Sequence, residues 1–170
     1  MAREYAFLMI DYDTPELIKD IQSQIPEEEL YTEEDNDNYG LEKETHVTLV
    51  PCLENDANVE DLKKMLQPLD KYVLILNNVS MFDNNENYDV LKCGASSMVL
   101  NDTNRRIREK FPTHSEYAEY NPHVTIAYLK KGLGEKYIKE ILSPLVILKP
   151  KQFNFSFVGE DGQDRNIIFK

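Results

Sequence analysis

The sequence predicts an α+β fold with two similar lobes, built as one domain over residues 1–170. Apolar, β-branched runs alternate along the chain with segments whose apolar residues recur at helical spacing. Each half also contains one strand-like segment with the triplet His-Val-Thr, at residues 46–48 and 123–125. No linker or low-complexity segment divides the halves, and a hydrophobic content of 41% is enough to form a sizeable core.

Strands and helices alternate in the first half. Residues 5–12 form a predicted strand, and Thr14-Pro15-Glu16 then supplies an N-cap, a fixed-φ first turn and a favourable dipole charge for a helix. The first triplet lies on the next predicted strand. Apolar residues over 59–69 then recur at helical spacing, and residues 72–82 are apolar and β-branched enough to form a strand.

Residues 26–38, between the first helix and the first triplet, are strongly acidic. Charge repulsion is expected to keep this segment extended or mobile, either as a solvated loop, which the composition favours, or as a lid over a substrate. Residues 35–40 resemble the start of a calcium-binding loop. Tyr39 and His46, however, occupy its fifth and twelfth positions, so no calcium site is predicted.

The second half continues with a polar turn at 83–87, strand segments at 88–94 and 97–100, and a helix capped by Asp102 that contains Ile107 and Phe111. Beyond the second triplet, residues 137–142 predict a short helix. Residues 153–157 alternate as on a half-buried strand, and a turn at 161–162 leads to a last strand at 167–169. Each half is therefore expected to contain a triplet-bearing strand, a polar connection and then an amphipathic helix.

The net charge of −12 opposes binding to long nucleic acids, whose affinity comes mainly from Lys and Arg contacts with phosphates. Small nucleotides remain possible, because a local cationic patch can hold a few phosphates. The densest basic cluster could be such a patch, although a solvated helix face is the favoured interpretation; its members are Arg105, Arg106, Arg108 and Lys110.

Cysteine usage and the N-terminus predict a cytoplasmic, soluble protein. Cys52 and Cys93 lack CxxC spacing, as expected in a reducing compartment. The apolar run at residues 6–10 ends at Asp11 and is too short for a signal segment or a membrane span. No membrane association and no obligate protein partner are expected.

The two triplets carry the chemistry. Side chains alternate along a strand, so His46 and Thr48 share one face of theirs, as do His123 and Thr125. Near neutral pH one imidazole, with an ordinary pKa of about 6.5, can accept a proton while the other donates one. The hydroxyls can bind phosphate oxygens as charge develops on them. Side by side, the two strands predict phosphodiester cleavage that needs no metal and no cofactor.

Two other interpretations of the triplets are weaker. A lone histidine on an apolar strand is usually a core residue, but here two of only three histidines lie in near-identical strands. Neither triplet has a second histidine or a carboxylate at ligand spacing on its strand, so no metal site is predicted. The third histidine, His114, lacks the pattern and is expected at the surface.

The segments His46–Leu49 and His123–Ile126 resemble the paired motifs of the two-histidine (2H) phosphoesterase superfamily, and the resemblance spans most of the chain. It implies a bilobed fold in which pseudo-twofold related antiparallel sheets line a central cleft, with helices outside. It also implies metal-independent action on cyclic phosphates or RNA-type phosphodiesters. The matching motif positions give the catalytic residues, which are His46, Thr48, His123 and Thr125.

Residues 39–42, Tyr12 and the small acidic build further resemble the anti-CBASS nucleases of tailed phages. Those enzymes degrade the cyclic di- and trinucleotide signals of bacterial antiphage defence. The resemblance implies that a ribose 2′-hydroxyl attacks its 3′-phosphate, that one histidine takes the proton, and that the other protonates the departing 5′-oxygen. The resulting 2′,3′-cyclic phosphate is then hydrolysed with the roles reversed. The sequence does not assign the two roles.

Aromatic side chains are needed to stack on the bases of such a substrate. The candidates are Tyr12, Phe82 and Phe157. Phe82 and Phe157 could equally be core residues, whereas Tyr12, at the polar end of a strand, is expected to be exposed. Three alternatives remain: an RNA 2′,3′-cyclic phosphate phosphodiesterase or end-ligating relative, a non-catalytic nucleotide sponge, and a structural protein in which the triplets only pack.

Overall fold

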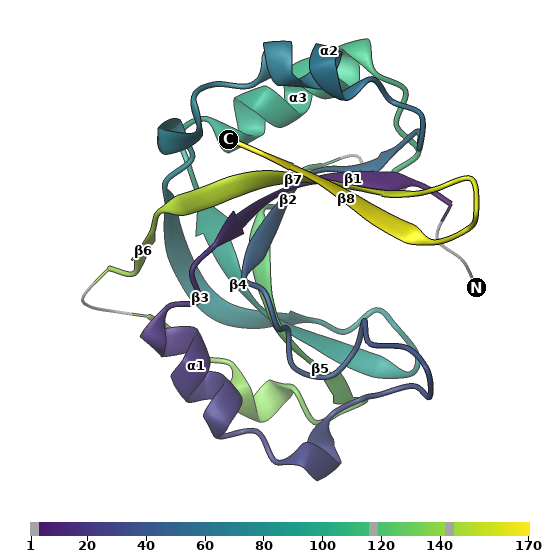
Figure 1. Cartoon of the computed structure of the whole chain (residues 1–170). Helices are drawn as coiled ribbons and strands as arrows, with labels where there is room; N and C mark the ends of the chain where they lie inside the picture. Colours follow the sequence, from purple (N-terminus) through teal and green to yellow (C-terminus); the bar gives the residue numbers. More distant parts are fainter. Residues whose placement is uncertain (1–3, 116–118, 142–144) are drawn as a thin grey trace.

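One antiparallel sheet organises the chain in the computed structural model, which describes residues 4–115, 119–141 and 145–170 (Figure 1). In this part of the chain the sheet has eight strands in the order β6-β3-β4-β5-β2-β1-β7-β8. The strands are β1 (Ala6–Tyr12), β2 (His46–Leu53), β3 (Leu74–Phe82), β4 (Tyr88–Ser96), β5 (His123–Lys130), β6 (Ile147–Leu148), β7 (Pro150–Val158) and β8 (Asp164–Phe169). The helices are α1 (Glu16–Ser23), α2 (Val59–Met65) and α3 (Leu100–Lys110), with 3-10 turns at Glu27–Glu29, Leu69–Lys71 and Glu135–Tyr137.

The sheet consists of two halves, β6-β3-β4-β5 and β2-β1-β7-β8, which meet where Val47 of β2 pairs with Val124 of β5. Each half has helices on its outer side, with α1 on one and α2 and α3 on the other (Figure 1). The predicted bilobed α+β fold is thus confirmed, with the two sheets joined into one.

Two helices cross between the halves. Helix α1 leaves β1 but packs against β5, and its Gln22 side chain donates to the backbone oxygen of Ile126 at 3.0 Å. Helix α3 leaves β4 but packs against β2, and its buried Asn104 donates to the backbone oxygen of Leu49 at 2.8 Å. Each helix therefore supports the histidine strand of the other half. The predicted repeat order of strand then helix is wrong for the second half, where a 3-10 turn follows β5.

Several predicted boundaries differ from the structure for local reasons. Pro15, and not Thr14, is the N-cap of α1, because the Thr14 hydroxyl accepts a hydrogen bond from Thr45 at 2.9 Å instead of capping the helix. Asn58 caps α2 through the backbone N–H of Asp61. That helix ends at Met65, shortly before Pro68, which cannot continue a helix.

Two predicted elements are wrong. The segment 97–100 is not a strand, because Val99 caps α3 and Leu100 begins it, which places Asp102 inside the first turn and not at the cap. The short helix predicted over 137–142 is a 3-10 turn that ends at Tyr137; Leu142 lies outside the described residues.

The acidic segment is docked and not extended away from the protein. The Tyr31 N–H donates to the Tyr128 backbone oxygen at 2.9 Å, and the Tyr128 N–H donates to the Gly40 oxygen at 2.8 Å. The rings of Tyr31, Tyr39, Tyr88 and Tyr128 form a cluster with centroids 5.0–5.5 Å apart. Lys136 pairs with Glu29, so the local charge is partly compensated.

None of the helices in the described ranges is long and apolar enough to cross a membrane.

Candidate active site

The two His-Val-Thr triplets come together at the junction of the two halves. Because Val47 lies opposite Val124 on antiparallel strands, His46 lies across from Thr125 and Thr48 lies across from His123. Both valines are fully buried on one face of the sheet, and the four polar side chains are half-buried on the other. The sequence-predicted histidines and threonines therefore share a face around a local pseudo-twofold axis.

Both imidazoles are anchored in the same way. His46 Nδ1 lies 2.9 Å from the backbone oxygen of Glu44, and His123 Nδ1 lies 2.9 Å from that of Asn121. A carbonyl only accepts, so each Nδ1 carries a hydrogen. Nε2 is then the nitrogen of each ring that can take up or release a proton.

The charges beside the two histidines are opposite. On β1, Asp11 lies directly across from His46, so it is on the same face of the sheet. Its carboxylate is almost fully buried and accepts hydrogen bonds from Gln152 at 2.8 Å and Asn154 at 3.4 Å. On β4, Gly94 lies across from His123, and Lys92 lies across from Thr125. One half of the site thus has an anion beside its histidine, and the other has a cation beside its threonine.

His123 also has an aromatic neighbour. The Phe82 ring stands perpendicular to the imidazole, with the two centroids 5.0 Å apart. Lys92 Nζ lies 4.4 Å from the centre of the same ring and donates to the Ser80 hydroxyl at 2.7 Å. Burial lowers the pKa of His123, and the positive charges of Lys92 and His46 lower it further, against the opposing effect of the Asn121 hydrogen bond.

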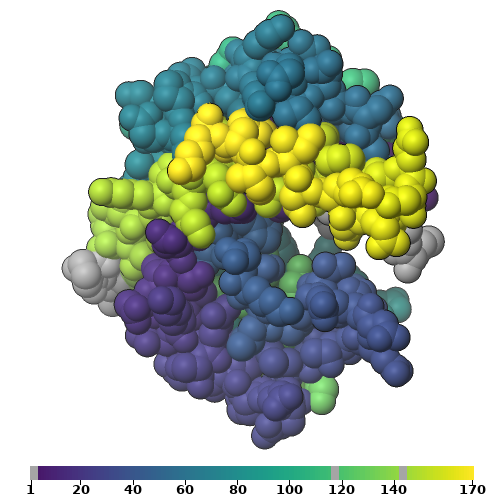
Figure 2. Space-filling model, in the orientation of Figure 1, coloured from purple at the N-terminus to yellow at the C-terminus, as the bar shows by residue number. Residues whose placement is uncertain are grey.

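The space-filling view shows a hollow between the two halves (Figure 2). We refer to a cavity of about 450 Å³, lined by Thr48, Phe82, Tyr88 and His123 among others, as the central cavity. A second hollow of about 620 Å³, the Lys92 cavity, shares Phe82 and His123 with it. A third of about 630 Å³, the α3 cavity, adjoins the central cavity along helix α3. Each of these three volumes suits a nucleotide-sized ligand.

The three predicted stacking residues have different locations. Phe82 lines the central cavity and is 36% exposed, so its ring can meet a ligand. Tyr12 is only 1% exposed, and its hydroxyl donates to the backbone oxygen of Tyr72 at 2.6 Å. The expectation that Tyr12 is exposed is therefore wrong, because the segment after α2 covers it.

Phe157 is also not brought to the site. It stacks on Phe155 at 5.6 Å and packs against the core. On β7 it alternates with Ser156, which lies across from Phe7, so it projects from the face of the sheet opposite to the histidines. A base in the cleft cannot reach its ring.

Sequence reasoning did not identify Asp11, Lys92 or Tyr120 as site residues. Tyr120 lines all three cavities, and its hydroxyl donates to the Thr48 backbone oxygen at 2.7 Å. These positions depend on strand register and loop path, for which a single sequence carries no signal. Across the described ranges, no three His, Cys, Asp or Glu side chains group closely enough to hold a metal ion.

Comparison with known families gives one match. The model of the 2′-5′ RNA ligase superfamily matches residues 14–158, which include both histidine strands and all of the cavity-lining residues of α3. No curated protein shows significant similarity to this chain.

Two solved structures have a similar fold. One, described as the crystal structure of a phosphoesterase, has a TM-score of 0.54 and 15% identity, covering 98% of this chain and 95% of that chain. The other, TT0787 of Thermus thermophilus, has a TM-score of 0.52 and 14% identity, with the same coverage of 98% and 95%. At this identity the likeness is one of fold.

Proposed function

The chain belongs to the 2′-5′ RNA ligase superfamily of two-histidine phosphoesterases, and from this premise we propose that it cleaves 3′-5′ phosphodiester bonds of cyclic di- or trinucleotides without a metal. The observation that carries the proposal is the pairing of Val47 with Val124, which places two imidazoles and two hydroxyls around one centre. A phosphate at that centre meets an acid, a base and hydroxyl donors together.

The surroundings of the two histidines support different roles in the first step. Burial lowers the pKa of His123, which favours its neutral form, so we assign it as the general base. His46 is then the general acid. Its positive charge in that role faces the carboxylate of Asp11 on the neighbouring strand.

In the proposed reaction, His123 Nε2 takes the proton of a ribose 2′-hydroxyl as its oxygen attacks the adjacent phosphorus. His46 gives its proton to the departing 5′-oxygen, and a 2′,3′-cyclic phosphate forms. In the second step neutral His46 takes a proton from water, and protonated His123 returns one to the leaving ribose oxygen, which restores both histidines. Thr48 and Thr125 donate to the non-bridging oxygens while negative charge builds on them.

Substrate size is argued from charge and shape. The net charge of −12 disfavours a long polyanion, whereas the cleft presents Lys92 and the partly exposed Phe82 ring beside His123. A cation for phosphate and a ring for base stacking suit a small oligonucleotide. We propose that the biological substrates are the cyclic nucleotide signals of CBASS antiphage defence, in the cytoplasm of an infected cell.

Incubation of the protein with a panel of cyclic di- and trinucleotides in EDTA tests the proposal. The expected result is a linear product, with a 2′,3′-cyclic phosphate as a transient intermediate and the same rate with and without chelator. Intact nucleotides throughout the panel, or loss of activity in EDTA, would contradict it. Tight binding of the nucleotides without any cleavage would instead identify a sponge.

A second candidate is hydrolysis of 2′,3′-cyclic phosphates on RNA ends, which we consider because the description of the matched family names RNA. The same assay separates the two. An RNA oligonucleotide with a 2′,3′-cyclic end should be a poorer substrate than a cyclic dinucleotide if our proposal is correct, and a better one if the second candidate is correct.

A further inference from the structure

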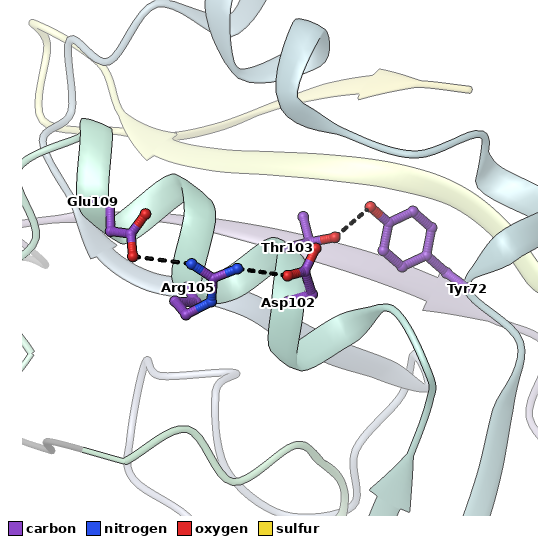
Figure 3. A network of polar contacts seen from close by, with 5 residues as sticks. All are labelled: Tyr72, Asp102, Thr103, Arg105 and Glu109. Atoms are coloured by element: carbon purple, nitrogen blue, oxygen red, sulfur yellow. Dashed lines mark hydrogen bonds and ion pairs between the residues drawn. The ribbon is translucent and has the colours of Figure 1, made fainter.

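The basic cluster on α3 contains two differently placed arginines. Arg105 lies between two carboxylates, donating to Asp102 at 2.7 Å and to Glu109 at 3.0 Å (Figure 3). Arg108 is half-buried, and no hydrogen bond or ion pair joins its guanidinium to any residue in the described ranges. The positive charge of Arg105 is therefore already compensated, whereas no residue of the described ranges compensates that of Arg108.

Arg108 faces the cleft. It lines both the central cavity, which it shares with His123 and Thr48, and the adjoining α3 cavity. The buried Asn104, one helical turn before it, lines the same two cavities. Asn104 is fixed by its hydrogen bond to the Leu49 oxygen, so this side of the helix is held against the histidine strand.

We propose that Arg108 is a second phosphate subsite, which binds a phosphate of the substrate other than the one being cleaved. This inference rests on the proposed function for the position of the scissile phosphate. A half-buried guanidinium without a carboxylate partner binds a phosphate strongly, because it can donate two parallel hydrogen bonds to it. The ligand class is an oligonucleotide with at least two phosphates, as in a cyclic di- or trinucleotide.

The charge of Glu119 acts against such a subsite. Glu119 is exposed and lines the same two cavities, but it forms no ion pair with Arg108 within 4.0 Å. Its carboxylate should repel a phosphate held at Arg108. Removing the charge of Glu119 should therefore tighten the binding of a ligand with two phosphates, whereas removing that of Arg108 should weaken it.

Binding of two deoxydinucleotides tests the proposal. The ligand d(ApA) has one phosphate and d(pApA) has two, and neither has the 2′-hydroxyl that the reaction requires, so titration calorimetry measures binding without turnover. Arg108→Ala is compared with Arg106→Ala as the matched control. Arg106 is also half-buried on α3 but lines none of the three cavities.

The wild type should bind d(pApA) more tightly than d(ApA). Arg108→Ala should weaken binding of d(pApA) by about tenfold to a hundredfold, the typical strength of a hydrogen bond to a charged group, and change that of d(ApA) by less than about twofold. Arg106→Ala should change neither, and Glu119→Gln should tighten d(pApA) alone. Circular dichroism of each variant checks its fold.

Equal losses on both ligands, no loss on d(pApA), or the same loss in Arg106→Ala would each overturn the subsite. These outcomes are separable from failure of the proposed function. If no cyclic nucleotide is cleaved but the phosphate-dependent loss is found, the subsite stands and the proposed reaction falls. If cyclic nucleotides are cleaved and Arg108→Ala does not discriminate, only the subsite falls.

Discussion

Val47 on β2 and Val124 on β5 lie directly opposite each other where the two halves of the sheet meet. Both are fully buried, and each lies between a histidine and a threonine in the chain. One small apolar contact therefore holds the two His-Val-Thr triplets in register. Its loss should lower the free energy of unfolding.

Truncation of either valine to alanine should lower the free energy of unfolding by about 2 kcal/mol, from two lost methyl groups and the cavity that they leave. Urea denaturation measures this value. Ile167→Ala, at an exposed position on β8, is the control and should change stability by less than about 0.5 kcal/mol. A loss of similar size in the control would show that the junction has no special importance.

His46→Ala and His123→Ala should each lower the rate of cyclic dinucleotide cleavage by at least about a hundredfold, the usual contribution of a general acid or base. His114→Ala serves as the control, because His114 is exposed, stacks on Tyr5 and contacts Glu54 away from the site. It should retain the wild-type rate within about threefold. A histidine whose removal leaves the rate unchanged has no part in the mechanism.

The pH dependence should identify His123 as the base. Its neutral form is required, so kcat/KM should fall as the pH decreases through its lowered pKa. Lys92→Met removes a positive charge that lowers this pKa, so the acidic limb should move to higher pH. The shift should be less than about one unit, because burial is the larger cause and remains. The control is Lys71→Met, at an exposed position on the 3-10 turn at Leu69–Lys71, which should leave the acidic limb at the wild-type pH. If the acidic limb moves to lower pH in Lys92→Met, the assignment of His123 as the base is wrong.

The tyrosine cluster should hold the acidic segment in place. Tyr39→Ala removes ring contacts with Tyr31, Tyr88 and Tyr128, so cleavage of residues 27–38 by a glutamate-specific protease should accelerate by about tenfold or more. Tyr39→Phe keeps the ring and should be cleaved at the wild-type rate. Equal cleavage of both variants would mean that backbone hydrogen bonds alone dock the segment.

The strands and the two triplets could be predicted because their signals are local. An apolar run with period two, or a repeated tripeptide, is visible without knowing what it packs against. The short run at 97–100 shows the limit. Its apolar residues suit a strand or the start of a helix equally well, and only the packing of Leu100 and Ile107 into the core determines the helix.

Asp11 and Lys92 could not be predicted, because their roles depend on which strands are neighbours and on their register. Asp11 lies across from His46 only because β1 pairs with β2 in this register. Lys92 lies across from Thr125 only because β4 pairs with β5 in this register. The prediction for Tyr12 failed for a related reason. A polar strand end suggested exposure, but a segment 60 residues later in the chain covers the ring.

The strand order also has consequences for how the chain folds during synthesis. The half made of β3, β4, β5 and β6 uses the continuous stretch 74–148, whereas β1 must wait for β7, with Phe7 pairing to Ser156. Closing so long a loop is slow, so pulsed hydrogen exchange should detect protected amides in β3 and β4 before β1. On the ribosome, β1 must therefore remain without its partner until β7 (Pro150–Val158) has emerged, and during that interval its apolar residues are exposed to aggregation and to chaperones.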